Sequence, residues 1–185
     1  MARQVKVITA AEAAALIKNG DTVTTSGFVA SAIPEALDRA VEERFLATGE
    51  PRDITYVYCG SQGNKDGRGA EHFAHEGLLK RYIAGHWATV PALQKMALEN
   101  KMEAYNVSQG ALCHLFRDIA AHRPGCFTKV GLGTFIDPRN GGGKVNDVTK
   151  EDIIELVNIK GQDYLFYPAF PINVALIRGT YADES

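Results

Sequence analysis

Short apolar runs and longer amphipathic stretches alternate along the first two thirds of the chain. The runs are short and carry β-branched and aromatic residues, a composition that favours strands. Four of them predict strands, at residues 5–8, 22–25, 54–59 and 102–107. The stretches that follow have apolar residues at helical spacing. They predict helices that begin at residues 9, 34, 91 and 108.

Local signals mark the starts of these helices. Thr9 and Glu12 are spaced as in a capping box, and Ser108 is a good N-cap residue. Pro34 and Pro91 stand where the first turn of a helix accepts proline. Strands that alternate with helices are typical of βαβ units. The sequence therefore predicts an α/β fold, an open and mostly parallel sheet with helices on both faces.

The pattern changes after residue 125. The segment "TKVGLGTF" is followed by a glycine-rich stretch, 137–144, which we interpret as a mobile surface loop rather than a site. Three later runs, "ELVNI", "YLFY" and "VALIRG", predict strands, the first two joined across residues 160–163. We expect a small antiparallel extension near the C-terminus. A chain of 185 residues that is 45% hydrophobic can bury one substantial core, so residues 1–185 are expected to form one domain.

Charge and cysteine content narrow the class of protein. The chain has 20 Lys and Arg against 22 Asp and Glu, a net charge of -2, and no basic run longer than two residues. This argues against nucleic acid and against a polybasic membrane patch. The 3 cysteines form no C-x-x-C pair, and no apolar stretch reaches the roughly 20 residues that span a bilayer. We expect a reduced, cytoplasmic protein without a membrane span.

The glycine-rich stretches do not fit nucleotide-binding motifs. A P-loop that ended at Gly143-Lys144 would need glycine at Pro138 and Ser or Thr at Val145. The segments 67–72 and 131–136 each begin Gly-x-Gly but lack the third glycine of the dinucleotide fingerprint.

Two further candidates are weak. Ser61 lies in "CGSQG", where Cys59 replaces the first glycine of a nucleophile elbow, so a role in a strand-end turn is favoured. His72 and His75 are three residues apart, but no third ligand is visible nearby. They do not predict a metal site, and we expect none.

The segment "NVSQGALCHLF" is more informative. With Ser108 as N-cap, Gln109 and Gly110 fall in the first turn of a helix, where free N–H groups and the helix dipole favour anions. The corner Ser26-Gly27-Phe28 also follows a strand, so it should lie at the same carboxyl edge of the sheet, where open α/β sheets bind ligands. The simpler alternative is that Gly27 only makes a tight turn and Gln109 only begins its helix.

At these residues the chain resembles the family I CoA-transferases. The α-like half of that family carries Asp/Asn-Gly, two spacers, three apolar residues, Gly-Gly-Phe, three spacers and Gly-x-Pro. Residues 19–34, "NGDTVTTSGFVASAIP", follow this pattern in register. The departures are Thr24 and Thr25 for apolar residues, and Ser26 and Ala32 for glycine.

A second block strengthens the resemblance. Residues 105–135 are similar to the family's Gln-Gly helix start, followed by a strand with a Gly-x-Gly-Thr turn. With residues 67–91 and 133–153, the resemblance covers nearly the whole chain. It is closest to the single-chain propionate/acetate CoA-transferases, in which α-like and β-like halves are fused.

The resemblance implies an activity and a set of residues. Family members transfer CoA between a short-chain acyl-CoA, such as propionyl-CoA or acetyl-CoA, and a carboxylate, such as acetate or propionate, through a glutamyl-CoA thioester. CoA is then a substrate, and no permanently bound cofactor is expected. By carry-over, Gln109 and Gly110 would contact the acyl group or carboxylate, and Gly27, Phe28 and Val29 would form the wall beside it.

The nucleophile is expected outside this chain. The family's glutamate lies in the β-like half, within Glu-Asn-Gly or Glu-Ser-Gly, and neither sequence is present here. Glu184 aligns with a turn at the end of the α-like half. We therefore expect no catalytic glutamate in this chain, which would be a fragment or one subunit, inactive alone, that associates with the β-like half and forms homo-oligomers.

Two alternatives remain from the residues alone. A related α/β fold can serve as a non-catalytic sensor of a sugar phosphate or small anion, for which the helix start at Ser108 is equally suited. The chain can also be a structural piece that binds nothing and is held by its partner.

Overall fold

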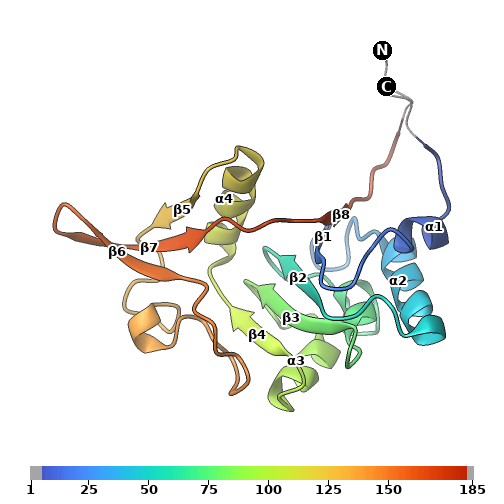
Figure 1. The fold of residues 1–185 in the computed structure, drawn as a ribbon, viewed down its shortest axis with the longest axis horizontal. Helices are drawn as coiled ribbons and strands as arrows, with labels where there is room; N and C mark the ends of the chain where they lie inside the picture. The colour runs from blue at the N-terminus through green and yellow to red at the C-terminus, as the bar shows by residue number, and fades with distance from the viewer. Residues whose placement is uncertain (1–5, 183–185) are drawn as a thin grey trace.

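Five parallel strands form the main sheet of the computed structural model, which describes residues 6–182 (Figure 1). Their order is β4-β3-β2-β1-β8, and each neighbouring pair is parallel. The strands are β1 (Thr22–Thr25), β2 (Ile54–Tyr58), β3 (Leu79–Ala84), β4 (Glu103–Asn106) and β8 (Val174–Leu176). Parallel strands need crossover connections, which the helices supply.

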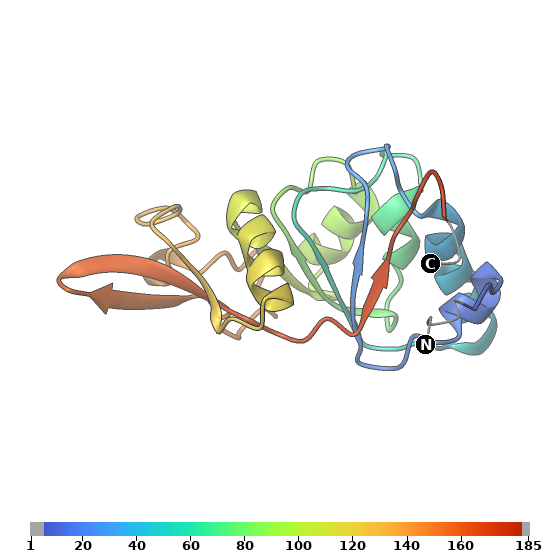
Figure 2. The same ribbon diagram turned by 90° about the horizontal axis from the view of Figure 1, so that it is seen from above.

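Helices cover both faces of this sheet, so the predicted α/β architecture is confirmed (Figure 2). Alternate side chains of one strand enter different cores: Tyr56 packs with the first helices, whereas Val57 packs beneath the fourth. One face carries α1 (Ala10–Ala14), α2 (Glu35–Thr48), the 3-10 helix η1 (Gly69–Phe73) and α3 (Pro91–Leu98). The opposite face carries α4 (Gln109–Ala120).

A second sheet of three antiparallel strands extends to one side of the main sheet (Figure 1). Its strands, in spatial order, are β5 (Gly125–Thr128), β7 (Gln162–Pro168) and β6 (Glu155–Ile159). Phe127 and Phe166 stack on one another in it, with ring centroids 4.4 Å apart. The predicted antiparallel extension is therefore present, and a short 3-10 helix, η2 (Pro138–Asn140), lies between β5 and β6 in the chain.

Three details of the strands differ from the sequence-based expectation. Residues 6–8 form no strand, and Val5 lies outside the described residues. β3 was not predicted, because Lys80 and Arg81 interrupt its apolar run; Arg81 is accommodated by ion pairs with Glu103 and Glu151.

The third difference concerns a later strand. The run "VALIRG" does not join the extension, because residues 174–176 pair in parallel with β1. The strand and Gly-x-Gly-Thr turn expected within residues 105–135 are present, as β5 and the turns at residues 130–133.

The triple glycine is packed against the sheet rather than forming a mobile surface loop. The backbone N–H of Asn106 donates to the Gly143 carbonyl at 2.8 Å. Gly143 has a φ of +75°, and a Cβ there would lie 2.7 Å from the Asn106 carbonyl oxygen. A glycine is needed because the two backbones approach so closely.

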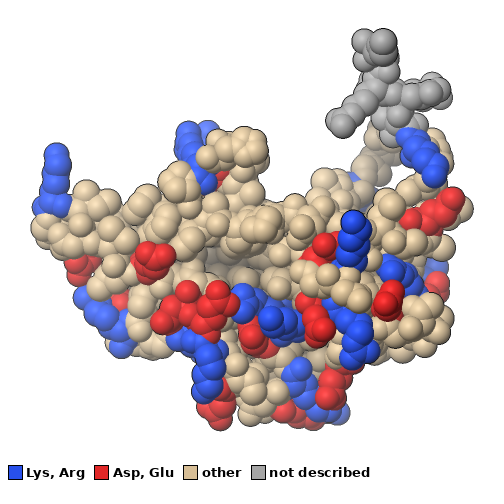
Figure 3. Space-filling model, in the orientation of Figure 1, with Lys and Arg blue, Asp and Glu red and all other residues tan. Residues whose placement is uncertain are grey.

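Charges of both signs are interspersed on the face shown in Figure 3. One of the ion pairs on a helix surface joins Arg39 and Glu43, which lie one turn apart on α2. Within residues 6–182, no helix combines the length and the apolar character that crossing a bilayer requires.

Candidate binding site at the carboxyl edge of the sheet

The start of α4 presents Gln109 and Gly110 to solvent. Ser108 is the N-cap residue, and its Oγ accepts a hydrogen bond from the Ala111 N–H at 3.3 Å. Gln109 and Gly110, the first two helical residues, are both exposed. A Cβ on Gly110 would meet no atom within 4 Å. The first turn of α4 is therefore open, with an amide side chain and backbone N–H groups available to a ligand.

The loop between β1 and α2, residues 26–34, is held in an unusual conformation. Gly27 has a φ of +110°, and a Cβ there would lie 2.8 Å from the Ser31 carbonyl oxygen. Val29 and Ala32 have φ values of +53° and +55°. A β-branched residue rarely adopts a left-handed conformation, and such strain concentrates at functional sites. The loop exposes 58% of Phe28.

Gly60 brings the two regions together. A Cβ on Gly60 would lie 3.4 Å from the Gln109 amide and 3.4 Å from the Phe28 ring. Gly85 also allows a close approach to Gln109. A Cβ at Gly85 would lie 2.6 Å from the Gln109 Cα and 2.3 Å from the Cys59 carbonyl oxygen. The structure therefore places Phe28 beside Gln109 at one edge, as the sequence predicted.

Gly60 and Gly85 were missed by sequence reasoning. Each follows a strand end closely, Gly60 after β2 and Gly85 directly after β3. A glycine at the carboxyl end of a parallel strand was the signal that could have identified them, because such a position lets another backbone or a ligand approach.

The serine considered as a nucleophile is buried. Ser61 is 1% exposed, and its hydroxyl shares a hydrogen bond with the Thr89 hydroxyl. Its carbonyl accepts from the Val29 N–H at 3.0 Å. Ser61 thus supports the loop, in agreement with the turn role favoured from the sequence.

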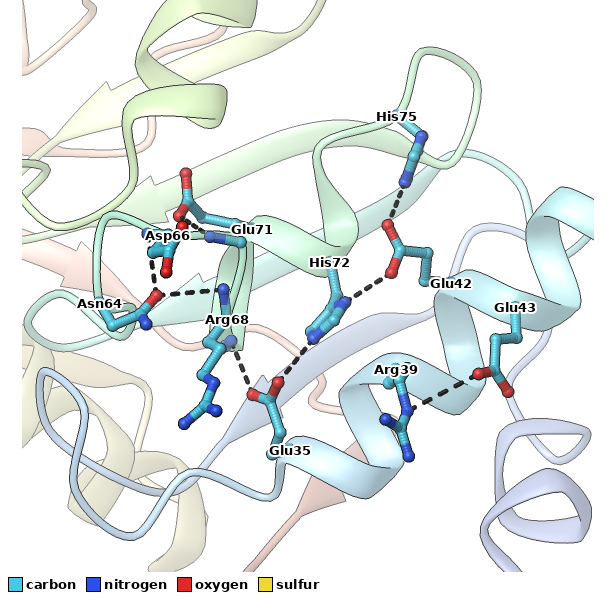
Figure 4. Close-up of polar contacts among 12 residues, drawn as sticks. Glu35, Arg39, Glu42, Glu43, Asn64, Asp66, Arg68, Glu71, His72 and His75 are labelled. Atoms are coloured by element: carbon cyan, nitrogen blue, oxygen red, sulfur yellow. Dashed lines mark hydrogen bonds and ion pairs between the residues drawn. The ribbon is translucent and has the colours of Figure 1, made fainter.

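His72 and His75 contact glutamates of α2 (Figure 4). His72 lies between two of them, with its Nε2 3.0 Å from Glu35 and its Nδ1 2.5 Å from Glu42. The Nε2 of His75 lies 2.6 Å from the other Glu42 oxygen. Burial works against protonation of His72, but the hydrogen bonds to Glu35 and Glu42 outweigh it and raise its pKa. These contacts of His72 and His75 with Glu35 and Glu42 connect η1 and the residues after it to α2.

Asp38 of α2 lies in the adjacent core. It is 0% exposed, and neither carboxyl oxygen has a hydrogen-bond partner. Burial raises the pKa of Asp38 to about 7, although the charge of His72 acts in the opposite direction. Among residues 6–182, no group of three or more His, Cys, Asp or Glu side chains is arranged to hold a metal ion.

A hollow near this edge lies beside the loop rather than between Phe28 and Gln109. It measures about 530 Å³ and is lined by residues of the loop, the start of α2, Arg68 and residues 177–179. Neither Gln109 nor Phe28 lines it. We place the candidate site at Gln109 because the amide, the strained loop and the tight glycine contacts converge there.

The chain is an open parallel α/β domain with an exposed helix start and a strained loop at the carboxyl edge of its sheet, the edge at which open α/β sheets bind ligands. The family model for coenzyme A transferase matches residues 7–185. The chain belongs to this coenzyme A transferase family.

Curated relatives and a solved structure also support membership of this family. A caffeate CoA-transferase of Acetobacterium woodii is 42% identical over 180 residues, 97% of this chain and 34% of the relative. The acetate CoA-transferase YdiF of Escherichia coli K12 is 39% identical over 98% of this chain and 34% of its own length. A crystal structure of the acyl-CoA transferase YdiF of E. coli O157:H7, as a thioester complex with CoA, matches with a TM-score of 0.87 and 37% identity, over 94% of this chain and 34% of that one. The chain thus spans about a third of the length of these relatives.

Proposed function

We propose that this chain forms the α-like part of an enzyme that transfers CoA between a short-chain acyl-CoA, such as propionyl-CoA or acetyl-CoA, and a carboxylate such as acetate or propionate. The observation that carries the proposal is the contact at Gly60, which places the Gln109 amide beside the Phe28 ring. An amide donor next to an apolar wall is suited to a small carboxylate or acyl group, which has one polar and one apolar end.

Gln109 and Gly110 supply the polar side of the proposed site. The Gln109 amide and the open N–H groups of the first turn of α4 would donate to a carboxylate or to the oxyanion that develops at a thioester carbonyl. Gly27 lets the loop turn, so that Phe28 and Val29 form the apolar wall. CoA enters as a substrate, and the proposal includes no resident cofactor.

The covalent step requires a nucleophile from outside the chain. In the proposed reaction a glutamate carboxylate of a β-like half attacks the donor thioester and expels CoA thiolate. The thiolate then attacks the glutamyl carbonyl, forms a glutamyl-CoA thioester and releases the donor carboxylate. The acceptor carboxylate takes CoA by the reverse sequence. The crystal structure of E. coli YdiF as a thioester complex with CoA supports this chemistry.

The relatives support acetate as one substrate but differ among themselves. One is named an acetate and another a caffeate CoA-transferase. We favour a short-chain acid because the Phe28 ring lies beside the Gln109 amide, and we propose that Val29 extends this wall. We also propose that the chain associates with the β-like half, that the enzyme is a homo-oligomer, and that it acts in the cytoplasm.

A chimera tests the proposal. This chain replaces the matching segment of E. coli YdiF, and the formation of acetyl-CoA from propionyl-CoA and acetate is followed by chromatography. Gln109→Ala is expected to lower kcat/KM about 100-fold, the usual effect of losing one well-placed donor. Gln162→Ala, an exposed glutamine in the antiparallel sheet, is the matched control and should leave exchange unchanged.

Three further measurements separate the proposal from its alternatives. After incubation with propionyl-CoA, mass spectrometry should find the CoA adduct on a peptide outside this chain, and the chain alone should show no turnover. Turnover by the chain alone, or an adduct on one of its own glutamates, would contradict the proposal. Calorimetric binding of a sugar phosphate without exchange by the chimera would favour the sensor.

A further inference from the structure

Gln62 is a buried amide beneath the strained loop. It is 0% exposed and lies four residues after the end of β2. Its Oε1 accepts hydrogen bonds from the Thr25 hydroxyl at 2.8 Å and the Tyr56 hydroxyl at 2.7 Å. These two hydroxyls lie 2.6 Å from each other. The acceptor end of the amide is therefore fixed by two neighbouring strands.

The donor end of the same amide contacts the loop. Its Nε2 donates to the Ser26 carbonyl, the residue directly before Gly27. The backbone adds one hydrogen bond on each side of Gln62. The Val29 N–H donates to the Ser61 carbonyl at 3.0 Å, and the Gly63 N–H donates to the Val29 carbonyl at 2.9 Å. The loop is thus bonded to this segment both before and after Phe28.

A strained loop persists only when its surroundings determine it fully. Some other bonds of the loop are internal, such as the pair that joins Phe28 and Ser31 at 2.9 Å in both directions. At β8, the Ser26 N–H donates to the Leu176 carbonyl at 2.9 Å, and the Arg178 N–H donates to the Ser26 Oγ at 2.8 Å. These bonds close the turn and hold its first residue at β8. Gln62 adds the side-chain connection to the interior, because it joins the loop to the two hydroxyls of β1 and β2.

We propose that Gln62 is a positioning residue, which holds residues 26–32 so that Phe28 and Val29 face the substrate beside Gln109. This inference rests on the proposed function for the identity of the substrate. It adds a residue that touches neither substrate nor CoA but fixes those that do.

Gln62→Glu tests the role through pH. A protonated carboxyl can still donate to the Ser26 carbonyl, whereas an ionised one cannot and repels it. Burial raises the pKa of a carboxyl at such a position. As pH rises, the carboxyl introduced in Gln62→Glu should therefore ionise and lose its hydrogen bond to the Ser26 carbonyl. The titratable groups facing it are Tyr56 and, near Tyr56, Asp38, whose pKa is about 7. Wild-type protein is therefore measured at every pH.

Gln94→Glu is the matched control. The Gln94 amide, in α3, also donates to a backbone carbonyl, that of Trp87 at 2.6 Å. It contacts neither the loop nor α4 through this bond. Any general effect of replacing a donating amide by a carboxyl will appear in this variant as well.

The first readout is amide hydrogen exchange in this chain, resolved by NMR. In Gln62→Glu, exchange of the Val29 and Gly63 N–H groups is expected to increase at least tenfold between pH 6 and pH 8.5, beyond the rise in wild type. Gln94→Glu should match wild type at these two amides. Unchanged protection of both amides would overturn the inference. If Gln62→Glu does not fold, Thr25→Val, which removes one hydroxyl from Oε1, is expected to raise exchange at the same amides at all pH values.

The second readout is exchange kinetics in the chimera. The kcat/KM of Gln62→Glu should be near the wild-type value at pH 6 and at least tenfold below it at pH 8.5. The kcat/KM of Gln94→Glu should match wild type at both pH values. A loop that opens without any change in kcat/KM or in the preference between propionyl-CoA and acetyl-CoA would reject the positioning role. A wild-type chimera that folds but shows no exchange would reject the proposed function, while the NMR measurement would still decide whether Gln62 holds the loop.

Discussion

Two βα units meet at the candidate site, and they are built by different means. In the β4–α4 unit, two residues separate the strand from the helix, and Ser108 caps the helix with its own side chain. In the β1–α2 unit, nine residues lie between strand and helix, and the N-cap Pro34 makes no side-chain hydrogen bond. The first unit is determined locally, whereas the second depends on contacts from elsewhere in the chain.

The buried faces of the two helices differ in the same way. α4 buries Ala111, Leu112 and Leu115, an apolar set that needs no polar partner. α2 buries Asp38 without any hydrogen bond and forms the glutamate–histidine contacts with η1. We infer that α4 supplies a firm support for Gln109, while the β1–α2 unit keeps a strained and costly conformation at the place where we propose that it contacts the ligand.

Alanine at the glycine of each unit should give the largest contrast. Gly27→Ala places a Cβ 2.8 Å from a backbone oxygen at a φ of +110°, so we expect a loss of about 3–5 kcal/mol in the free energy of unfolding. A Cβ at Gly110 meets no atom and Gly110 lies in a helix, so Gly110→Ala should stabilise the fold by up to about 1 kcal/mol. Denaturant titration of both variants measures this contrast. Equal losses would contradict the distinction between the two units.

Removing the buried charge of α2 should have the next largest effect. The folded-state pKa of Asp38, about 7, lies above its ordinary value of 3.8, so the native state holds the proton more tightly. The contribution of this group to stability is therefore present at low pH and is lost as pH rises from about 4 to about 7. At pH 8 Asp38→Asn should stabilise the fold by roughly 2 kcal/mol, because the full shift corresponds to about 4 kcal/mol and the buried amide retains part of the cost.

The advantage of Asp38→Asn should shrink towards zero near pH 4, which thermal unfolding across pH can measure. Asp118→Asn in α4 is the control, because the Asp118 carboxylate pairs with Arg123 at 3.1 Å and gains nothing from neutralisation. An Asp38→Asn variant that is less stable than wild type at pH 8 would indicate a partner for this carboxylate.

The contrast between the units also explains what the sequence could predict. Ser108, Gln109 and Gly110 were placed correctly because an N-cap and a first turn depend on neighbouring residues. The conformation of Val29 could not be predicted, because it depends on Gln62 and Ser61, more than thirty positions away. The strand at residues 174–176 was assigned to the wrong sheet for the same reason, since its pairing with β1 crosses most of the chain. Local signals predicted the elements, and long-range packing decided their partners.

The smallest expected effect concerns the strain itself. Val29 is 37% exposed and has a φ of +53°, a conformation that glycine adopts without cost. Val29→Gly relieves this strain but gives the unfolded chain more freedom, so the two effects should cancel to within about 0.5 kcal/mol. Val148→Gly, at a turn valine of similar exposure, 40%, whose φ is not positive, should lower the free energy of unfolding by about 1 kcal/mol, because glycine gives the unfolded chain more freedom. Chemical denaturation of the two variants compares them directly. If Val29→Gly lowered the free energy of unfolding as much as Val148→Gly, the loop would store no strain. The two βα units would then differ in loop length alone.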